Sequence, residues 1–411
     1  MQKSKYLLFQ LFLYLVSPLL SLIVSVRFYK NPISQFMFVL VAFYFGWFFP
    51  FDSDLYMHYV SCLRYFVGLS WSEILEDPRV FYLGTEMYHV ILKYLVSRVT
   101  DNPHFFGGVC CGIYAAFFIF FFRQLKTFYL RKQNFLNLTL LLVVVLTVEF
   151  RWFQGVRYWP GVFVFLGFYL KFVNSKNYLY LLGCLIAPFF HITLLTLIGG
   201  LALDYLLKFT GKYVRLALFG LSLFVRSLNV DFVPWLLKIG FLKGYLKLAL
   251  FNQDIRANDL QKAEEYRELH NFYYAIRPYF GILIGLIVLF FFYMKKATDN
   301  KDHVKVLTMA LTMFTIANFG YGDIIFYDRF NKVATLIFFV YLYMASVDHW
   351  PRLRGIQFPL AIPVAILAFY FALTVMVELR ANLYDPNLVF GNFFRQGADM
   401  FKQWGKGWIF V

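Results

Sequence analysis

Charged residues are scarce in this chain: Asp, Glu, Lys and Arg together make up only 15% of its 411 residues. Because 61% of the residues are hydrophobic, too few polar side chains remain to cover the surface of a soluble protein of this length. Apolar runs of about 18 residues or more recur from end to end, and each is long enough to cross the hydrocarbon core of a bilayer. The sequence therefore predicts an integral membrane protein.

Several sequence motifs are also missing. There is no Gly-rich loop ending in Lys-Ser or Lys-Thr, no pair of His residues at metal spacing, and no Ser flanked by glycines at the nucleophile-elbow spacing. ATP-driven transport and metalloprotease chemistry are therefore not expected, and neither a cofactor nor a metal ion is predicted. The four cysteines mostly lie in apolar segments without zinc spacing, which indicates ordinary core residues: Cys62, Cys110, Cys111 and Cys184.

The formal net charge of +16 would suggest nucleic acid binding in a soluble protein. Here the Lys and Arg residues cluster in short loops between apolar runs, which is typical of the positive-inside rule and of contacts with lipid headgroups. No nucleic acid partner is expected. The basic loops, which we place in the cytoplasm, are 123–132, 171–176, 208–215, 295–305 and 352–354.

The apolar runs predict an all-α fold, a polytopic membrane protein of about 10–12 transmembrane helices forming one membrane-embedded domain over residues 1–411. The first run lacks a small-residue cleavage site and is too long for a signal peptide, so we interpret it as a retained span. The expected spans are 6–28, 32–49, 104–122, 135–150, 157–173, 213–228, 274–294, 304–319, 330–347 and 358–376.

Two regions are expected outside the membrane on the extracytoplasmic face. Loop 51–103 contains the segment 82–99, whose four titratable side chains favour an amphipathic interfacial helix over a span: Glu86, His89, Lys93 and Arg98. Loop 229–273 opens with an apolar and basic piece and then becomes charged. Both a solvated helical cap and a mobile flap over a substrate groove fit that pattern.

The segment 178–207 is too long for one simple span and carries Pro188 and His191 near its middle. Proline interrupts a helix, so the pattern favours a broken helix or two half-helices that enter and leave by the same face. A lone imidazole in the apolar sequence FFHITLL needs a polar partner, which gives His191 a functional role, direct or through another group.

Carboxylates at the membrane edge are candidates for a general base. Asp52 and Asp54, in FPFDSDLYMHY, directly follow the second expected span, and aromatic neighbours would partly desolvate such a carboxylate and make it a stronger base. A simple polar stop after a span is the alternative. Glu86 and His89, one helical turn apart, form either a general-base pair or the polar face of an interfacial helix.

Arginines at the ends of apolar runs are candidates for an anion site. Arg151 and Arg157 lie at the mouth of one run, and Arg329 lies just before a late one. An arginine at bilayer depth costs roughly 2.5–3.5 kcal/mol, so a retained one often binds an anion, and its planar fork suits phosphate oxygens. For Arg329 the alternative is a headgroup contact in which it pairs with Asp328.

Several of these motifs, taken in their order along the chain, resemble those of the EpsG-type proteins, which are Wzy-like exopolysaccharide and O-antigen polymerases. The motifs are an aromatic-flanked Asp followed by Tyr, a Glu then a Tyr, an Arg before an aromatic residue at the head of a middle span, and a Phe-His pair in the next one. The resemblance covers roughly residues 51–197 and one later arginine. It departs at the Tyr-Trp-Pro that follows the middle arginine, where the family more often has Gln and small residues. The matching positions are Asp54, Glu86, Arg157, His191 and Arg329.

The resemblance implies a metal-independent glycosyltransferase with a fold similar to the GT-C glycosyltransferases, in the inner membrane of a bacterium. Its substrate, as both donor and acceptor, would be an undecaprenyl-diphosphate-linked oligosaccharide that is polymerised into a surface polysaccharide such as O-antigen, exopolysaccharide or capsule. Membrane lipids and a chain-length regulator are the other partners that it suggests. In this reading Arg157, Arg151 and Arg329 hold the diphosphate, while Asp54, with Glu86 second, takes the proton of the acceptor hydroxyl.

Two other functions fit parts of the pattern. A flippase or transporter of lipid-linked oligosaccharide would also hold arginine in its core, but it should show duplicated halves with matching broken helices. A membrane acyltransferase acting on sugars would use His191 as its base and would need a tunnel for the acyl donor. That function leaves the arginines unexplained.

Overall fold

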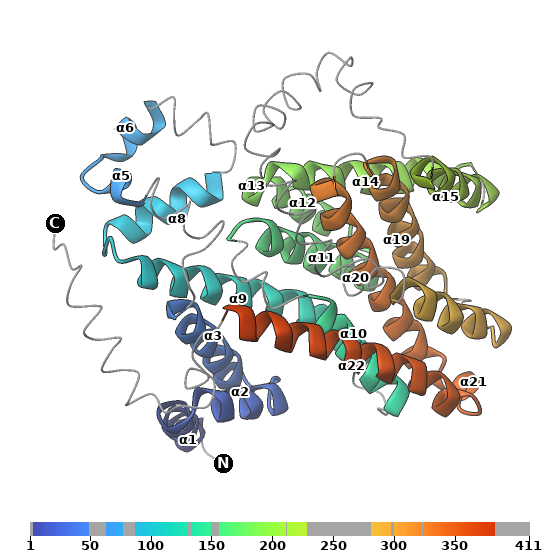
Figure 1. Cartoon of the computed structure of the whole chain (residues 1–411), viewed down its shortest axis with the longest axis horizontal. Coiled ribbons are helices and arrows are strands. Elements are labelled where there is room, and N and C mark those ends of the chain that lie inside the picture. The colour runs from blue at the N-terminus through green and yellow to red at the C-terminus, as the bar shows by residue number, and fades with distance from the viewer. Residues whose placement is uncertain are drawn as a thin grey trace. The chain divides into compact units, whose positions relative to one another are not determined.

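The computed structural model describes residues 3–48, 63–76, 87–129, 134–148, 156–210, 212–227, 281–296, 300–321 and 324–382 (Figure 1). Every regular element among these residues is a helix, and they contain no strand, so the predicted all-helical class is confirmed. The chain divides into two compact units. Unit 1 comprises Met1–Thr127, Glu149–Thr196 and Leu373–Val411, and unit 2 comprises Phe128–Val148 and Leu197–Ala372.

Two of the described helices are long and apolar enough to cross a membrane. They are Pro103–Leu125 within α9 (Pro103–Tyr129) and Phe326–Asp348 within α20 (Ile324–Asp348). By length and composition these helices suggest a membrane protein. Their surroundings differ, because half of the α9 segment is buried inside the protein whereas 94% of the α20 segment is buried.

The predicted first span, 6–28, is wrong in its continuity. The chain forms two helices there, α1 (Lys3–Val16) and α2 (Pro18–Arg27), separated by Ser17, whose backbone is extended. Pro18 occupies the first turn of α2, where its missing N–H and fixed φ are tolerated, and the Ser17 side chain accepts a hydrogen bond from the Leu20 amide. Neither helix alone has the roughly 20 residues that a span requires.

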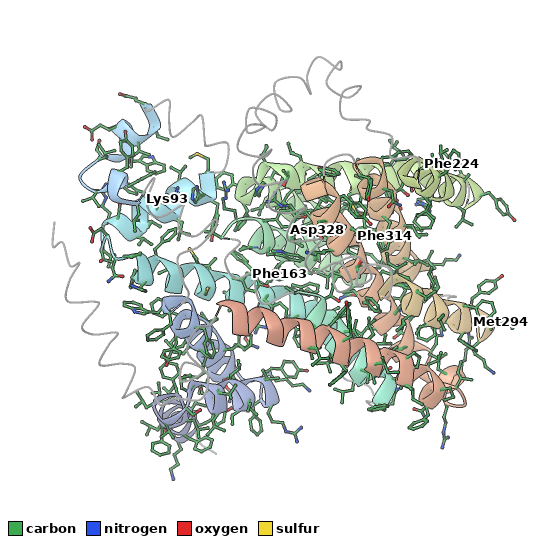
Figure 2. The ribbon with its side chains drawn as sticks, in the orientation of Figure 1. Lys93, Phe163, Phe224, Met294, Phe314 and Asp328 are labelled. Carbon is green, nitrogen blue, oxygen red and sulfur yellow. The ribbon has the colours of Figure 1, made fainter. Side chains whose placement is uncertain are left out.

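Unit 1 is built around α9 and α11 (Tyr158–Ser175), whose facing aromatic side chains form its core. Phe163 of α11 stacks on Phe121 of α9 at a centroid distance of 5.8 Å and meets the edge of Tyr114 at 5.1 Å (Figure 2). The predicted break in 178–207 is confirmed, because the chain there forms four short pieces. The smaller elements of this region are α3 (Pro32–Trp47), α5 (Arg64–Phe66), α6 (Trp71–Glu76), α8 (Met87–Ser97), α12 (Leu179–Cys184), α13 (Ala187–Phe190), η3 (Ile192–Leu194) and the start of α14 (Leu195–Leu207).

Unit 2 packs around α20, whose apolar segment is 94% buried, as expected for a central helix. The α20 helix packs against α19 (Lys301–Phe319) and α10 (Phe135–Thr147), and α19 packs in turn against α15 (Lys212–Ser227). The remaining described helices are Gly281–Met294, α21 (Trp350–Leu353) and α22 (Gln357–Asn382). The predicted loop 229–273 and the predicted segment 51–62 lie outside the described residues.

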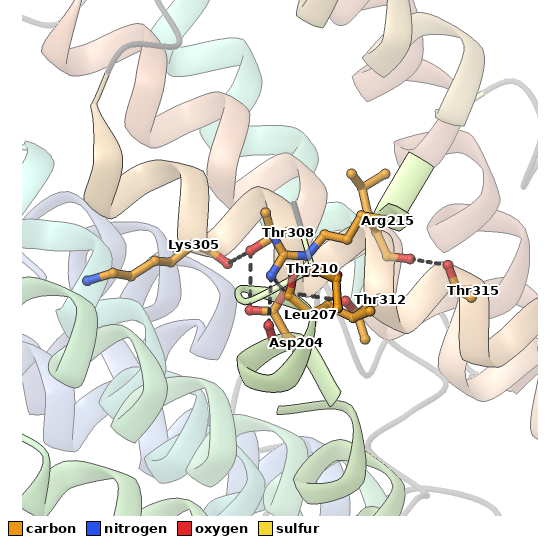
Figure 3. Close-up of polar contacts among 9 residues, drawn as sticks. Asp204, Leu207, Thr210, Arg215, Lys305, Thr308, Thr312 and Thr315 are labelled. Carbon is orange, nitrogen blue, oxygen red and sulfur yellow. Dashed lines mark hydrogen bonds and ion pairs between the residues drawn. The ribbon is translucent and has the colours of Figure 1, made fainter. Parts of the chain in front are cut away.

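A polar cluster ties three helices of unit 2 together (Figure 3). The Arg215 Nη2 donates to the backbone oxygen of Asp204 at 2.7 Å and pairs with its Oδ1 at 3.1 Å, so the guanidinium also caps the last turn of α14. Thr308 and Thr312 of α19 donate to the two carboxylate oxygens at 3.2 and 3.4 Å. Both charged side chains are largely buried, so each depends on the other to offset its loss of hydration.

We expect Asp204→Asn to destabilise the protein by about 3 kcal/mol or more, because the substitution leaves a buried guanidinium without its charge partner. The measurement is the thermal unfolding midpoint of the purified protein in detergent. Asp328→Asn is the matched control, since its ion pair with Lys332 is more exposed and should contribute about 1 kcal/mol or less. Equal midpoints for the two variants would contradict a stabilising role for this cluster.

Candidate functional site

The structure describes three of the predicted site residues. Arg157 and His191 lie in unit 1, and Arg329 lies in unit 2. The other three, Asp54, Glu86 and Arg151, lie outside the described residues, although Glu86 directly precedes α8 in the sequence. The site is therefore built from the head of α11 and the helix break that contains His191.

Arg157 is the N-cap residue of α11 and makes no side-chain capping hydrogen bond to the helix. It is half-buried, and the residues on either side of it are buried: Val156 and Tyr158. Val156 belongs to an apolar cluster with residues of α8 and α9, which fixes the start of α11 against both helices. The partial positive charge of a helix N-terminus adds to that of the guanidinium, so this position favours a bound anion.

His191 separates α13 from η3 and has an extended backbone. The break follows from the sequence, because Pro188 lies in the first turn of the short helix α13 and the His191 imidazole caps the next element, η3. The Thr193 backbone N–H donates to His191 Nδ1 at 3.2 Å, and the Thr193 hydroxyl lies 2.9 Å from the same nitrogen. An Nδ1 atom that accepts from a backbone amide leaves the proton of a neutral ring on Nε2. His191 is thereby set up as a donor at Nε2.

The break packs directly against the head of α11 at a glycine. A Cβ atom on Gly161 would lie 2.9 Å from the Phe190 Cβ and 3.2 Å from the Ala187 carbonyl oxygen, and closer still to a methyl carbon of Leu194. No larger residue fits unless these atoms move. Next to this contact the rings of Tyr158 and His191 meet edge to face at 5.8 Å, so the structure brings the neighbourhoods of Arg157 and His191 together.

The α8 helix completes this region. Tyr88 packs on Phe190 at a ring distance of 4.4 Å, which places the start of α8 beside the break. In the predicted interfacial segment 82–99, the side chains of His89 and Lys93 are buried inside the protein. Leu92 and Val96 of α8 pack in one apolar cluster with Phe106 and Cys110 of α9. We refer to Arg157, His191, His89 and Lys93, with the helix ends that carry them, as the basic junction.

The described helices of the basic junction carry basic side chains and no acidic ones. None of the elements α8, α11, α12, α13 and η3 contains an Asp or Glu residue. Among the described residues of the chain, no group of three or more His, Cys, Asp or Glu side chains is placed to hold a metal ion. The guanidinium of Arg157 and the Nε2 of His191 are nitrogen donors of the kind that binds anions.

Arg329 lies within the second turn of α20, so the predicted helix start at residue 330 is wrong by six residues. The predicted alternative partner, Asp328, pairs instead with Lys332, one turn further on, at 2.7 Å. This pairing follows from helix geometry, because residues at i and i+4 are neighbours on the helix surface whereas adjacent residues point apart. Arg329 is half-buried.

Comparisons with protein-family models, with curated protein sequences and with solved structures find no match to this chain. The function is therefore inferred from the residues and their arrangement.

We expect Gly161→Ala to destabilise the protein, because the new methyl group collides with the helix break. Overpacking of a core typically costs about 1–3 kcal/mol, which exceeds the roughly 0.5–1 kcal/mol that Ala gains over Gly in a helix. The control is Gly199→Ala in α14, where the added Cβ meets nothing within 4 Å and stability should be equal or higher. Thermal unfolding of both variants in detergent measures the difference, and a Gly161→Ala variant as stable as Gly199→Ala would refute the close contact.

Proposed function

We propose that this protein is a membrane glycosyltransferase that polymerises oligosaccharide repeat units carried on undecaprenyl diphosphate. The basic junction is the observation that carries the proposal, because it combines Arg157, an α11 N-terminus and a helix break at His191. A diphosphate leaving group needs fixed cationic groups and donors at the position where its negative charge develops. The sequence resemblance to Wzy-like polymerases points to the same chemistry.

Exposed apolar side chains support the membrane part of the proposal. They line helices throughout the described chain and include Phe224 and Met294, whose side chains point away from the protein (Figure 2). Apolar surface on this scale is unfavourable in water and is typical of a lipid-facing surface. With the long apolar helices in α9 and α20, it favours a polytopic protein of about 10–12 transmembrane helices with a GT-C-like architecture, in the inner membrane of a bacterium.

In the proposed reaction, a hydroxyl group of the acceptor glycan attacks the anomeric carbon of the donor. The bond between that carbon and the diphosphate oxygen breaks, and the electron pair leaves with undecaprenyl diphosphate. Arg157 binds the diphosphate oxygens through its planar fork as their charge grows, and Arg151 and Arg329 are the other candidates for this role. The hydroxyl proton passes to a carboxylate, for which Asp54 and then Glu86 are proposed.

The hydrogen bonds of His191 favour a donor role over a base role. Its Nδ1 accepts from the Thr193 amide, so Nε2 carries the proton and suits a phosphate or sugar oxygen. This arrangement does not support the acyltransferase alternative, in which the imidazole removes a proton. The flippase alternative shares the anion site but makes no glycosidic bond, so an assay of bond formation separates the two.

The test uses purified full-length protein in proteoliposomes that contain lipid-linked repeat units. We expect a ladder of products on a gel together with release of undecaprenyl diphosphate. Movement of the lipid-linked oligosaccharide across the bilayer with no ladder would establish the flippase alternative. Absence of both activities with several repeat units would refute the proposed function.

We expect Arg157→Lys to be nearly as damaging to polymerisation as Arg157→Ala, because an ammonium keeps the charge but loses the two parallel hydrogen bonds of the guanidinium. The measurement is the rate of ladder formation by variants with normal expression and thermal midpoints. Arg123→Lys and Arg123→Ala, at an exposed arginine of α9, are the matched controls and should retain full activity. Wild-type ladders from Arg157→Lys would exclude bidentate binding by this residue.

We expect two substitutions of His191 to separate its capping role from its donor role. Asn keeps an oxygen near the Nδ1 position and preserves the cap, whereas Ala loses about 0.5–2 kcal/mol of stability. Gln places an amide donor near the Nε2 position. Polymerisation should fall by about 100-fold in His191→Asn, as for other lost oxyanion donors, and should partly survive in His191→Gln. A fully active and stable His191→Asn variant would limit this residue to capping.

A further inference from the structure

The first two helices, α1 and α2, bury polar side chains and expose apolar ones, which is the reverse of a soluble protein. Their buried residues are mostly polar: Tyr6, Gln10 and Tyr14 in α1, and Pro18, Ser21 and Ser25 in α2. Between residues 6 and 26 every exposed residue is large and apolar: Leu8, Phe9, Phe12, Val16, Leu20, Ile23 and Val26. Such a surface is unfavourable in water, so these two helices need an apolar surrounding.

Hydrogen bonds join the buried polar groups of three helices. The Gln10 Nε2 donates to the Tyr6 hydroxyl at 2.8 Å, and that hydroxyl lies 2.7 Å from the Ser34 hydroxyl of α3. The Ser21 hydroxyl of α2 donates to the Gln10 Oε1 at 3.4 Å. Polar side chains that pair between helices are typical of helix packing in membranes. The helices α1, α2 and α3 therefore form one packed group with its polar side inward (Figure 1).

The chain turns back between α1 and α2. Ser17 and Pro18 separate the two helices. Tyr6, near the start of α1, meets Phe28, just after the end of α2, with ring centroids 6.0 Å apart. The start of α1 and the end of α2 therefore lie side by side, and the turn lies at the other end of α1. The two helices form a hairpin.

Basic residues mark the open end of this hairpin. Lys5, Arg27 and Lys30 are exposed there, whereas no charged residue occurs from residue 6 to residue 26. Their positive charge complements anionic lipid headgroups. The turn is apolar on its surface, because Val16 and Leu20 are exposed beside it. The hairpin thus has one end suited to headgroups and one end suited to hydrocarbon.

We propose that α1 and α2 form a re-entrant hairpin that enters the cytoplasmic leaflet of the bilayer, turns at Ser17 and Pro18, and returns to the same face. Acyl chains of that leaflet cover its apolar surface, and its basic end lies at the headgroups. This inference rests on the membrane part of the proposed function and is independent of the chemistry.

The helix lengths and the basic residues fix the depth and the face. At 1.5 Å per residue α1 and α2 are about 21 and about 15 Å long, which fits one leaflet of roughly 15 Å better than a hydrocarbon core of about 30 Å. The positive-inside rule places the basic end in the cytoplasm. The same face follows from α3, which leads from this end to loop 51–103, expected outside the membrane on the other face.

The first test uses an impermeant thiol reagent on right-side-out and inverted membrane vesicles. Ser4→Cys and Lys30→Cys flank the hairpin at exposed positions, and Ser72→Cys, exposed in α6, is the control for the opposite face. The background carries Cys62→Ser, and the other native cysteines are buried: Cys110, Cys111 and Cys184. We expect Ser4→Cys and Lys30→Cys to react from the cytoplasmic face only, and Ser72→Cys from the other face. Reaction of the first two from opposite faces, or of all three from one face, would overturn the inference.

The second test distinguishes an inserted hairpin from one that lies flat or is covered by a second copy of the chain. Nitroxide labels are attached to Leu8→Cys and Val16→Cys in nanodiscs that contain phosphatidylglycerol, and collisions with oxygen and with a nickel chelate report their depth. We expect the Val16 position to lie deeper by up to about 12 Å, because eight helical residues separate the two sites. Equal depths would show a flat hairpin, and spin–spin broadening with loss of oxygen collisions would show a second copy. Either result would overturn the inference.

These tests are separate from the polymerisation assay. A protein that shows the expected sidedness and depth but forms no ladder retains the hairpin and defeats the proposed function. A protein that forms the ladder while Ser4→Cys and Lys30→Cys react from opposite faces defeats only the hairpin. Absence of the protein from the membrane fraction would defeat both.

Discussion

The contact between Gly161 and the broken helix is the constraint on which the candidate site depends. A helix break is unfavourable away from water, because it leaves backbone groups without their helical partners. Here the break is stabilised by close packing on α11, and only a residue without a Cβ permits that approach. The Gly161 amide also donates to the Arg157 carbonyl at 3.4 Å, so the residue that admits the break belongs to the same helical turn as the candidate diphosphate ligand.

The features that could be predicted from the sequence are those with local causes. Pro188 and His191 predict the break, because proline interrupts a helix and a side chain with an acceptor atom can cap the helix that follows. Both effects act within a few residues. The start of α11 could also be predicted, because the sequence changes from polar to apolar residues after Arg157. Ser17 and Pro18 are also a local signal, because a serine followed by proline is typical of a helix start. The prediction of one continuous span used only the length and hydropathy of the run and missed this signal.

What could not be predicted depends on which distant residues meet. Lys93 has the spacing of a solvated helix face, and nothing in 82–99 reveals that this side chain is buried. The Asp204 cluster joins residues about 100 positions apart, so no local pattern indicates it. The tautomer of His191 likewise follows from a hydrogen bond to Thr193 that requires the extended backbone of the break. In each case the tertiary structure sets the surroundings of a side chain, and these surroundings decide its chemistry.

The cations of unit 2 and those of the basic junction differ in the negative charge that their own helices supply. In unit 2, Arg215 pairs with Asp204, and Lys332 pairs with Asp328. Each of these cations meets a carboxylate of the helices that hold it, which is how a protein usually stabilises a charge away from water. The helices of the basic junction contain no carboxylate, although they carry Arg157, Lys93 and two imidazoles. The partners of these side chains therefore come from outside those helices, either from other parts of the chain or, under the proposed function, from a bound diphosphate.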